Sequence, residues 1–205
     1  MTALDETTLQ LVERARRQDT QAVGELLELH RSRLRRVVSA RLDRRLEGRL
    51  DASDVVQEAM LEASRRLPDY LNQTEVPFFA WLRALAMSRM IDAHRMHLAD
   101  KRSVRREAGG LLPPNDGSLA GLADRLAGRQ SSPSAQLIRG ESRARVRAAL
   151  DQLPDASREL LVLRYVEGLS PGETAAVLQT PERTIRRRHR DALVQLSKLL
   201  SQDGE

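Results

Sequence analysis

Two Ser/Thr-Pro pairs, Ser170-Pro171 and Thr180-Pro181, constrain the fold of this chain more than any other feature. Serine and threonine are favoured at helix N-caps, and proline is favoured at the first helical position because its missing N–H has no helical partner to lose. Glu173 follows Ser170 by three residues, which completes a capping box. The sequence therefore predicts two successive helices in which small alanines on the first allow a close crossing, as in a helix-turn-helix.

The second of these helices carries its arginines on one face. At about 100° per residue, one sector holds Arg183, Arg186, Arg187 and Arg190, and the opposite side holds Ile185, Ala192 and Leu196. Such a face is often only solvated, but these arginines begin in the first turn, where the helix dipole disfavours cations. We therefore expect DNA contact, with Arg186 and Arg187 at base edges, Arg183 and Arg190 at phosphates, and Thr180 and Thr184 beside them.

The composition favours an all-α fold. Aromatic residues make up only 2% of the 205 residues, while the helix formers leucine, alanine and arginine are abundant. Residues 107–135 are rich in Gly, Pro and Ser, which predicts a flexible linker with a short helical turn near 119–127. The expected organisation is two small helical domains, 1–106 and 136–205, joined by this linker.

An acidic stripe marks one helix of the first domain. We expect this helix to begin at the N-cap Asp51 and to end at Pro68. Asp51, Asp54, Glu58 and Glu62 fall within about 80° on it, with no adjacent base to neutralise them. A solvated face or a pair of catalytic carboxylates would also explain acids in this pattern, but no second cluster of ligands accompanies them. The stripe therefore predicts a surface for a partner protein.

Several classes of function are disfavoured by what the sequence lacks. Without cysteine there is no disulfide framework or thiol nucleophile, which fits a reducing cytoplasm. The longest apolar run, "FFAWLRALAM", is interrupted by Arg83, so we expect no membrane span and a cytoplasmic protein. His94 and His97 lack a third ligand, so we expect neither a metal nor a cofactor.

The stretch "LDQLPDASRELLVLRYVEGLSPGETAAVLQTPERTIRRRHRDAL" resembles region 4 of extracytoplasmic-function (ECF) sigma factors, a branch of the sigma-70 family. In that family region 4 reads the minus-thirty-five promoter element in the major groove. Taken alone, this half of the chain is equally similar to the output domain of a response regulator.

The first half also resembles this family. "DASDVVQEAMLEA" is similar to region 2.2, which implies that Asp54, Gln57 and Glu58 meet the clamp of the polymerase β′ subunit, and Asp51 and Glu62 extend the same stripe. The following segment resembles regions 2.3 and 2.4, which bind and melt the minus-ten element. The residues that this assigns to the opened strand are Ser88, Arg89, Arg95, Lys101, Arg102, Arg105 and Arg106. We expect Phe78, Phe79 and Trp81 to be core residues instead.

The resemblance at both ends predicts a sigma factor with regions 2 and 4 only, and not an enzyme. Its implied partners are core RNA polymerase, through the β′ clamp and the β subunit, and promoter DNA, and it leaves room for an anti-sigma factor. The chain departs from the family pattern at Ser88, His189 and Asp191. The promoter sequence that it prefers is therefore the property that can least be inferred from the family. The rival interpretations are a two-domain helix-turn-helix regulator that acts without polymerase, and an enzyme with a DNA-binding tail, for which no nucleotide loop or nucleophile motif is present.

Overall fold

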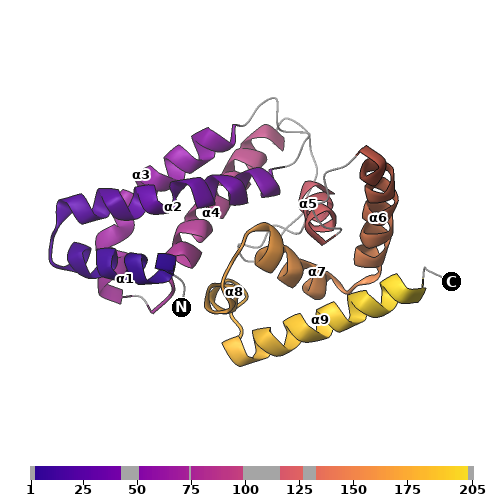
Figure 1. The fold of residues 1–205 in the computed structure, drawn as a ribbon. Helices are drawn as coiled ribbons and strands as arrows, with labels where there is room; N and C mark the ends of the chain where they lie inside the picture. Colours follow the sequence, from indigo (N-terminus) through magenta and orange to yellow (C-terminus); the bar gives the residue numbers. More distant parts are fainter. Residues whose placement is uncertain (1–2, 43–50, 74, 99–115, 127–132, 203–205) are drawn as a thin grey trace. The chain divides into compact units, whose positions relative to one another are not determined.

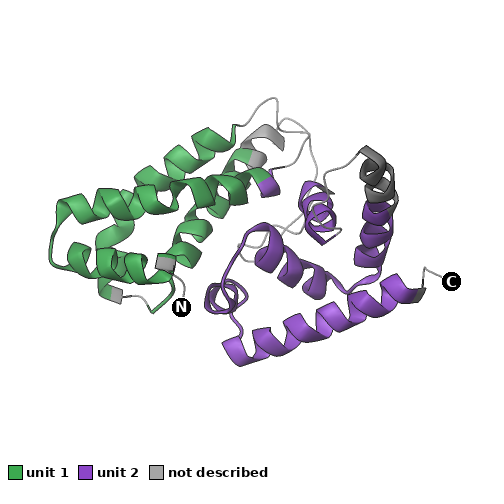
Figure 2. Ribbon diagram, in the orientation of Figure 1, with its two compact units in different colours: residues 1–39, 45–112 green, residues 40–44, 113–205 purple. Residues whose placement is uncertain are grey.

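The chain folds into helices throughout the part that the computed structural model describes, which is residues 3–42, 51–73, 75–98, 116–126 and 133–202 (Figure 1). This confirms the predicted all-α fold. The helices form two compact units, residues 1–39 with 45–112 and residues 40–44 with 113–205 (Figure 2). None of the described helices combines the length and the apolarity that crossing a membrane requires.

Among the described residues, unit 1 is a bundle of four helices. They are α1 (Ala3–Arg16), α2 (Thr20–Arg41), whose last two residues are grouped with unit 2, α3 (Ala52–Gln73) and α4 (Phe78–Leu98). Helix α3 packs against both α4 and α1. Leu26, Leu34 and Leu82 are fully buried between them, because apolar residues at three-and-four spacing line one face of each helix.

Aromatic rings fill the centre of unit 1. His30 of α2 lies with its ring centroid 5.3 Å from Phe78 and 5.5 Å from Phe79, both on α4. Tyr70 of α3 stacks on Trp81 at 4.6 Å between ring centroids. Phe78 and Phe79 are only 3% and 2% exposed. These two phenylalanines are therefore core residues, as the sequence predicted, and are not available to stack on bases.

The prediction that Pro68 ends its helix is wrong, because α3 continues through Pro68 to Gln73. A proline inside a helix removes one hydrogen bond and costs about 3 kcal/mol. The turn beyond it is held by packing instead: Tyr70 is 7% exposed, and its hydroxyl donates to the carbonyl oxygen of Val76 at 2.9 Å. Tertiary contacts thus outweigh the local preference of the proline.

Unit 2 contains the remaining helices. They are α5 (Asp116–Leu126), α6 (Pro133–Gln152), α7 (Asp155–Leu161), the π-helix η1 (Val162–Val166), α8 (Pro171–Val177) and α9 (Glu182–Gln202). Its core is built around Leu122, Leu150 and Leu161, none of which is more than 1% exposed. The long helix α9 packs on α6, α7 and α8, so this core also supports the basic helix predicted from the sequence.

The helical turn expected near 119–127 is the helix α5, which is part of the unit 2 core. Leu119 and Leu122 of α5 are 6% and 0% exposed, and α5 packs on α6 and η1. The segment expected as a linker, 107–135, therefore contains a packed helix. Its residues 107–115 and 127–132 lie outside the described residues.

A buried ion-pair cluster in unit 2 was not predicted from the sequence. Nε of Arg41 lies 2.6 Å from Oε1 of Glu167, and Nη2 of Arg41 lies 2.6 Å from Oε1 of Glu159. Burial by itself lowers the pKa of Arg41, but the two carboxylates outweigh it and raise the pKa above its usual range. Because the glutamates are 118 and 126 positions away in the sequence, no local pattern indicates this cluster.

Candidate DNA and partner interfaces

The helix-turn-helix begins with the predicted capping box. The backbone N–H of Glu173 donates to Oγ of Ser170 at 3.2 Å, and the backbone N–H of Ser170 donates to Oε2 of Glu173 at 2.7 Å. Pro171 occupies the first turn, and Gly168 before the cap has a φ of 68°, a conformation that glycine adopts without strain. Short-range sequence signals therefore fix the start of α8.

The start of α9 differs from the prediction at Thr180. Its hydroxyl donates to the carbonyl oxygen of Leu178 at 3.0 Å and so does not cap the helix. The carbonyl of Pro181 instead accepts from the backbone N–H groups of Thr184 and Ile185 at 2.8 and 3.1 Å. Thr180 therefore shapes the turn between the two helices, and Pro181 stands directly before Glu182, the first residue of α9, and not at the first helical position that the sequence predicted.

Helix α9 has the two faces that its sequence predicts. Ile185, Ala192 and Leu196 are 1%, 2% and 4% exposed and pack into unit 2. The exposed side carries Arg183, Arg186, Arg187, Arg188 and Arg190, and Thr184 is half-buried beside them. Arg188 lies outside the sector identified from the sequence but is exposed as well. Within the described ranges, Arg183 and Arg187 have no carboxylate within ion-pair distance, so their charge faces solvent unneutralised.

Arg186 differs from its neighbours because a carboxylate holds it. Nε and Nη2 of Arg186 donate to Oε1 of Glu182, one turn earlier, at 2.9 and 2.5 Å. Both side chains are largely exposed, at 67% for Arg186 and 44% for Glu182. The edge of the Arg186 guanidinium formed by Nε and Nη2 is thus occupied by Glu182, and no described acceptor contacts Nη1.

His189 anchors the middle of α9 to η1. Its Nε2 lies 3.2 Å from the hydroxyl oxygen of Tyr165, and the two ring centroids are 5.6 Å apart. Burial and the nearby charge of Arg164 lower the pKa of His189 below its usual range. The sequence had marked His189 only as a departure from the family pattern, and its partner, 24 positions away, gave no local signal.

Three of the four acids in the predicted stripe on α3 are exposed, namely Asp51, Asp54 and Glu58. Asp51 caps the helix through Oδ1, which accepts from the backbone N–H of Ser53 at 2.8 Å. Asp54, Gln57 and Glu58 are exposed, and so is Leu61, with 55% of its surface accessible. A large apolar side chain therefore stands next to carboxylates that have no basic partner among the described residues.

Glu62 does not belong to this unneutralised surface. It lies 2.5 Å from Nε of Arg66 and 3.3 Å from Nη2 of Arg89, and its side chain is only 15% exposed. The expectation that the acidic stripe has no adjacent base is therefore wrong for Glu62. The structure joins a residue expected at the polymerase to Arg89, a residue expected at the opened DNA strand. We call Asp51, Asp54, Gln57, Glu58 and Leu61 the α3 surface from here on.

The residues expected at the minus-ten strand are described only in part. Ser88 is exposed on α4, and Arg89 is 37% exposed beside Glu62. The side chain of Arg95 lies outside the described residues, as do Lys101, Arg102, Arg105 and Arg106. Ser88 and Arg89 both lie on α4, and Arg89 contacts Glu62 of α3.

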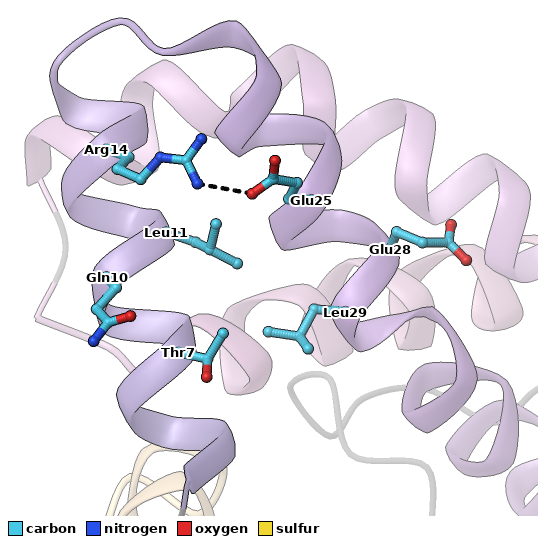
Figure 3. Close-up of a pocket in the computed structure, with 7 residues that line it drawn as sticks. All are labelled: Thr7, Gln10, Leu11, Arg14, Glu25, Glu28 and Leu29. Atoms are coloured by element: carbon cyan, nitrogen blue, oxygen red, sulfur yellow. Dashed lines mark hydrogen bonds and ion pairs between the residues drawn. The ribbon is translucent and has the colours of Figure 1, made fainter.

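Two surface hollows in unit 1 involve none of the predicted residues. One, of about 560 Å³, lies between α1 and α2 and is bordered by the ion pair of Arg14 and Glu25 at 2.8 Å (Figure 3). The other, of about 570 Å³, lies beside Pro68. In the described part of the chain, no three His, Asp or Glu side chains come close enough to hold a metal ion.

Comparisons with known proteins assign this arrangement to a family. Residues 26–98 match the family model for Sigma-70 region 2, and residues 143–196 match the one for Sigma-70, region 4. The chain is 34% identical to RNA polymerase sigma factor CnrH of Cupriavidus metallidurans, over 76% of each chain. The chain belongs to the ECF family of RNA polymerase sigma factors. It is also 32% identical to the ECF sigma factor SigD of Mycobacterium tuberculosis, over 91% of this chain and 81% of SigD.

A solved structure agrees with the fold of this ECF sigma factor. CnrH, in complex with the cytosolic domain of CnrY, superposes with a TM-score of 0.50 at 24% identity, covering 96% of this chain and 99% of that one. This similarity supports the fold alone. The region 2 match covers α3 and α4 with the acidic face, and the region 4 match covers the helix-turn-helix.

Proposed function

We propose that this sigma factor binds core RNA polymerase through the α3 surface and directs it to promoters whose minus-thirty-five element is read by α9. The observation that carries the proposal is the structure of α9, in which a buried apolar face fixes the helix and the opposite face presents Arg183, Arg186, Arg187 and Arg190. A capped α8 and a short turn precede it, which is the frame that places a helix in the major groove.

The arginines of α9 divide into two proposed roles. Phosphate contacts supply affinity without reading sequence, whereas base-edge contacts in the major groove discriminate. Arg183 and Arg190 are assigned to phosphates, and Arg186 and Arg187 to base edges, with Thr180 and Thr184 beside them. Arg187 is exposed and free of described carboxylates, which leaves its whole guanidinium for guanine O6 and N7.

The polymerase contact is assigned to the α3 surface. Unneutralised carboxylates attract a basic partner over a Debye length of about 8 Å at physiological salt. Leu61 gives the same surface an apolar element, and covering that side chain with a partner would remove apolar area from water. The proposed partner is a basic surface on the clamp of the β′ subunit, with further contacts to the β subunit.

The opened minus-ten strand is assigned to α4 and the residues that follow it. Single strands bind where a cationic track follows the backbone and pockets receive the bases. Ser88 and Arg89 supply the described part of this site, and Arg95, Lys101, Arg102, Arg105 and Arg106 are proposed to continue it. In this scheme the polymerase performs the chemistry and the sigma factor contributes binding alone.

A polymerase-dependent promoter-melting assay tests the proposal. The variant Asp54→Lys/Glu58→Lys should lose binding to core polymerase while it keeps its helix content. The variant Glu6→Lys/Glu75→Lys makes the same change in charge at two other exposed sites of unit 1 and should bind normally. Normal holoenzyme assembly by the first variant, with an unaltered circular dichroism spectrum, rules out the α3 surface as the contact.

The rival function is a helix-turn-helix regulator that binds duplex DNA without polymerase. It predicts a footprint by the purified protein alone and no co-purification with core polymerase. An anti-sigma factor is a further proposed partner, since CnrH was solved in complex with the cytosolic domain of CnrY. Competition between such a protein and core polymerase for this chain tests that partner.

A further inference from the structure

Glu182, at the start of α9, is an acidic residue in an otherwise basic part of the helix. Glu182 is exposed on the face assigned to DNA, where phosphates repel a negative charge. It is not simply solvated, because Oε1 accepts from both Nε and Nη2 of Arg186. We infer that Glu182 is a positioning and specificity residue that aligns Arg186 for a guanine in the minus-thirty-five element. This inference rests on the proposed function and deepens it.

The geometry of the guanidinium supports this assignment. A guanidinium has five N–H donors in a rigid fork, so a carboxylate on the Nε and Nη2 edge leaves both Nη1 donors and one Nη2 donor available. Guanine O6 and N7 accept a pair of such donors from the end of the group. Glu182 therefore occupies the edge of Arg186 that a guanine contact of this kind does not need.

Holding Arg186 before DNA arrives lowers the cost of binding. A free arginine loses rotamer entropy when it is fixed in one geometry. The contact with Glu182 restricts that freedom in the unbound protein, so less is lost on binding. The carboxylate is also well placed electrostatically, because the first turn of a helix favours a negative charge.

Glu182 lies close to the start of α8. A Cβ added at Gly172 would lie 3.4 Å from Oε2 of Glu182, and the glycine leaves this space open. Oε2 has no described hydrogen-bond donor. It is therefore free to accept from the amino group of an adjacent cytosine, which is the base edge that suits a carboxylate.

The test compares base preference and not only affinity. Holoenzyme made with the full chain is assayed for binding to a promoter set that carries each base pair at every minus-thirty-five position. Glu182→Ala should lower the preference for guanine at one position about fivefold, as expected for weakening one bidentate contact. Arg186→Ala should lose the same preference, and the double variant should lose no more than Arg186→Ala alone.

Asp191→Ala is the matched control, because it removes one exposed carboxylate from the same helix. It should strengthen binding to all sequences by a similar factor through reduced repulsion and leave base preference unchanged. The inference is overturned if Glu182→Ala behaves in the same way as Asp191→Ala while both retain the thermal stability of the parent. If the unaltered holoenzyme shows no base preference, the proposed function fails instead, so the two failures are distinguishable.

Discussion

The imidazole Nε2 of His189 lies 3.2 Å from the hydroxyl oxygen of Tyr165, which joins the exposed basic helix α9 to the π-helix η1. The backbone N–H of Glu167 donates to the carbonyl of Val162 at 3.1 Å, and this wider turn is what defines η1. A single-turn π-helix is rare and occurs often at functional sites. Here it carries the tyrosine that contacts α9, so the orientation of this basic helix depends in part on a polar contact.

Replacing Tyr165 with phenylalanine should lower the free energy of unfolding of unit 2 by about 1 kcal/mol, since the ring remains and one hydrogen bond is lost. Urea unfolding of the full chain measures this change. Tyr70→Phe is the matched control, because it removes a hydroxyl bond to Val76 in unit 1 and should leave DNA binding unaltered. If Tyr165→Phe has the stability and DNA affinity of the parent, the contact makes no contribution to holding α9.

The burial of His189 near Arg164 predicts how stability depends on pH. Burial and Arg164 lower the pKa of His189 in the folded protein, whereas in the unfolded chain histidine titrates near about 6.5. Between these two values the unfolded chain binds more protons, so stability falls as the pH drops below about 6.5 and levels off below the folded pKa. Urea midpoints measured from neutral to acid pH should show a smaller decline for His189→Gln. Parallel curves for the two proteins would exclude this coupling.

Because Glu62 is held in ion pairs and Glu58 is not, we predict that alanine substitutions at the two positions affect polymerase binding differently. Glu58 is exposed without a described base, so Glu58→Ala should weaken polymerase binding about tenfold, or about 1.4 kcal/mol. Glu62 is held by Arg66 and Arg89, so Glu62→Ala should weaken that binding little. Titration of labelled core polymerase with each variant measures both. An equal loss of polymerase affinity in the two variants would show that Glu62 is part of the polymerase contact.

The features that the sequence predicted correctly are those governed by neighbouring residues. The capping box of Ser170 and Glu173 involves groups three positions apart. The two faces of α9 follow from helical periodicity. Each of these depends on backbone geometry that is the same in any helix.

The features that the sequence did not predict depend on distant partners. Pro68 lies inside α3 because the turn beyond it packs on aromatic rings of α4. Arg41 is neutralised by glutamates more than a hundred positions away, and Glu62 is neutralised in part by Arg89 from the neighbouring helix. No pattern within one helix reveals these contacts, and they override local preferences that cost a few kcal/mol. The second partner of Glu62 is different, because Arg66 lies four positions later on α3 and helical periodicity does place the two side chains together.

The roles proposed for Arg187 and Arg183 predict that base reading and phosphate binding can be separated on α9. Arg187→Ala should cost promoter binding about 1–3 kcal/mol and relax the preference at one base pair, because an exposed guanidinium with no described acidic partner is lost from a guanine edge. Arg183→Ala should weaken binding to all sequences alike and reduce the dependence of log affinity on log salt by about one phosphate contact.

Holoenzyme binding to matched and single-substituted promoters, at several salt concentrations, measures both properties in one experiment. Circular dichroism of each variant checks that α9 is intact. The assignment of roles is reversed if Arg183→Ala changes base preference while Arg187→Ala changes only the salt slope. If both variants retain the affinity and the preference of the parent, the arginine face of α9 is solvated and does not contact DNA.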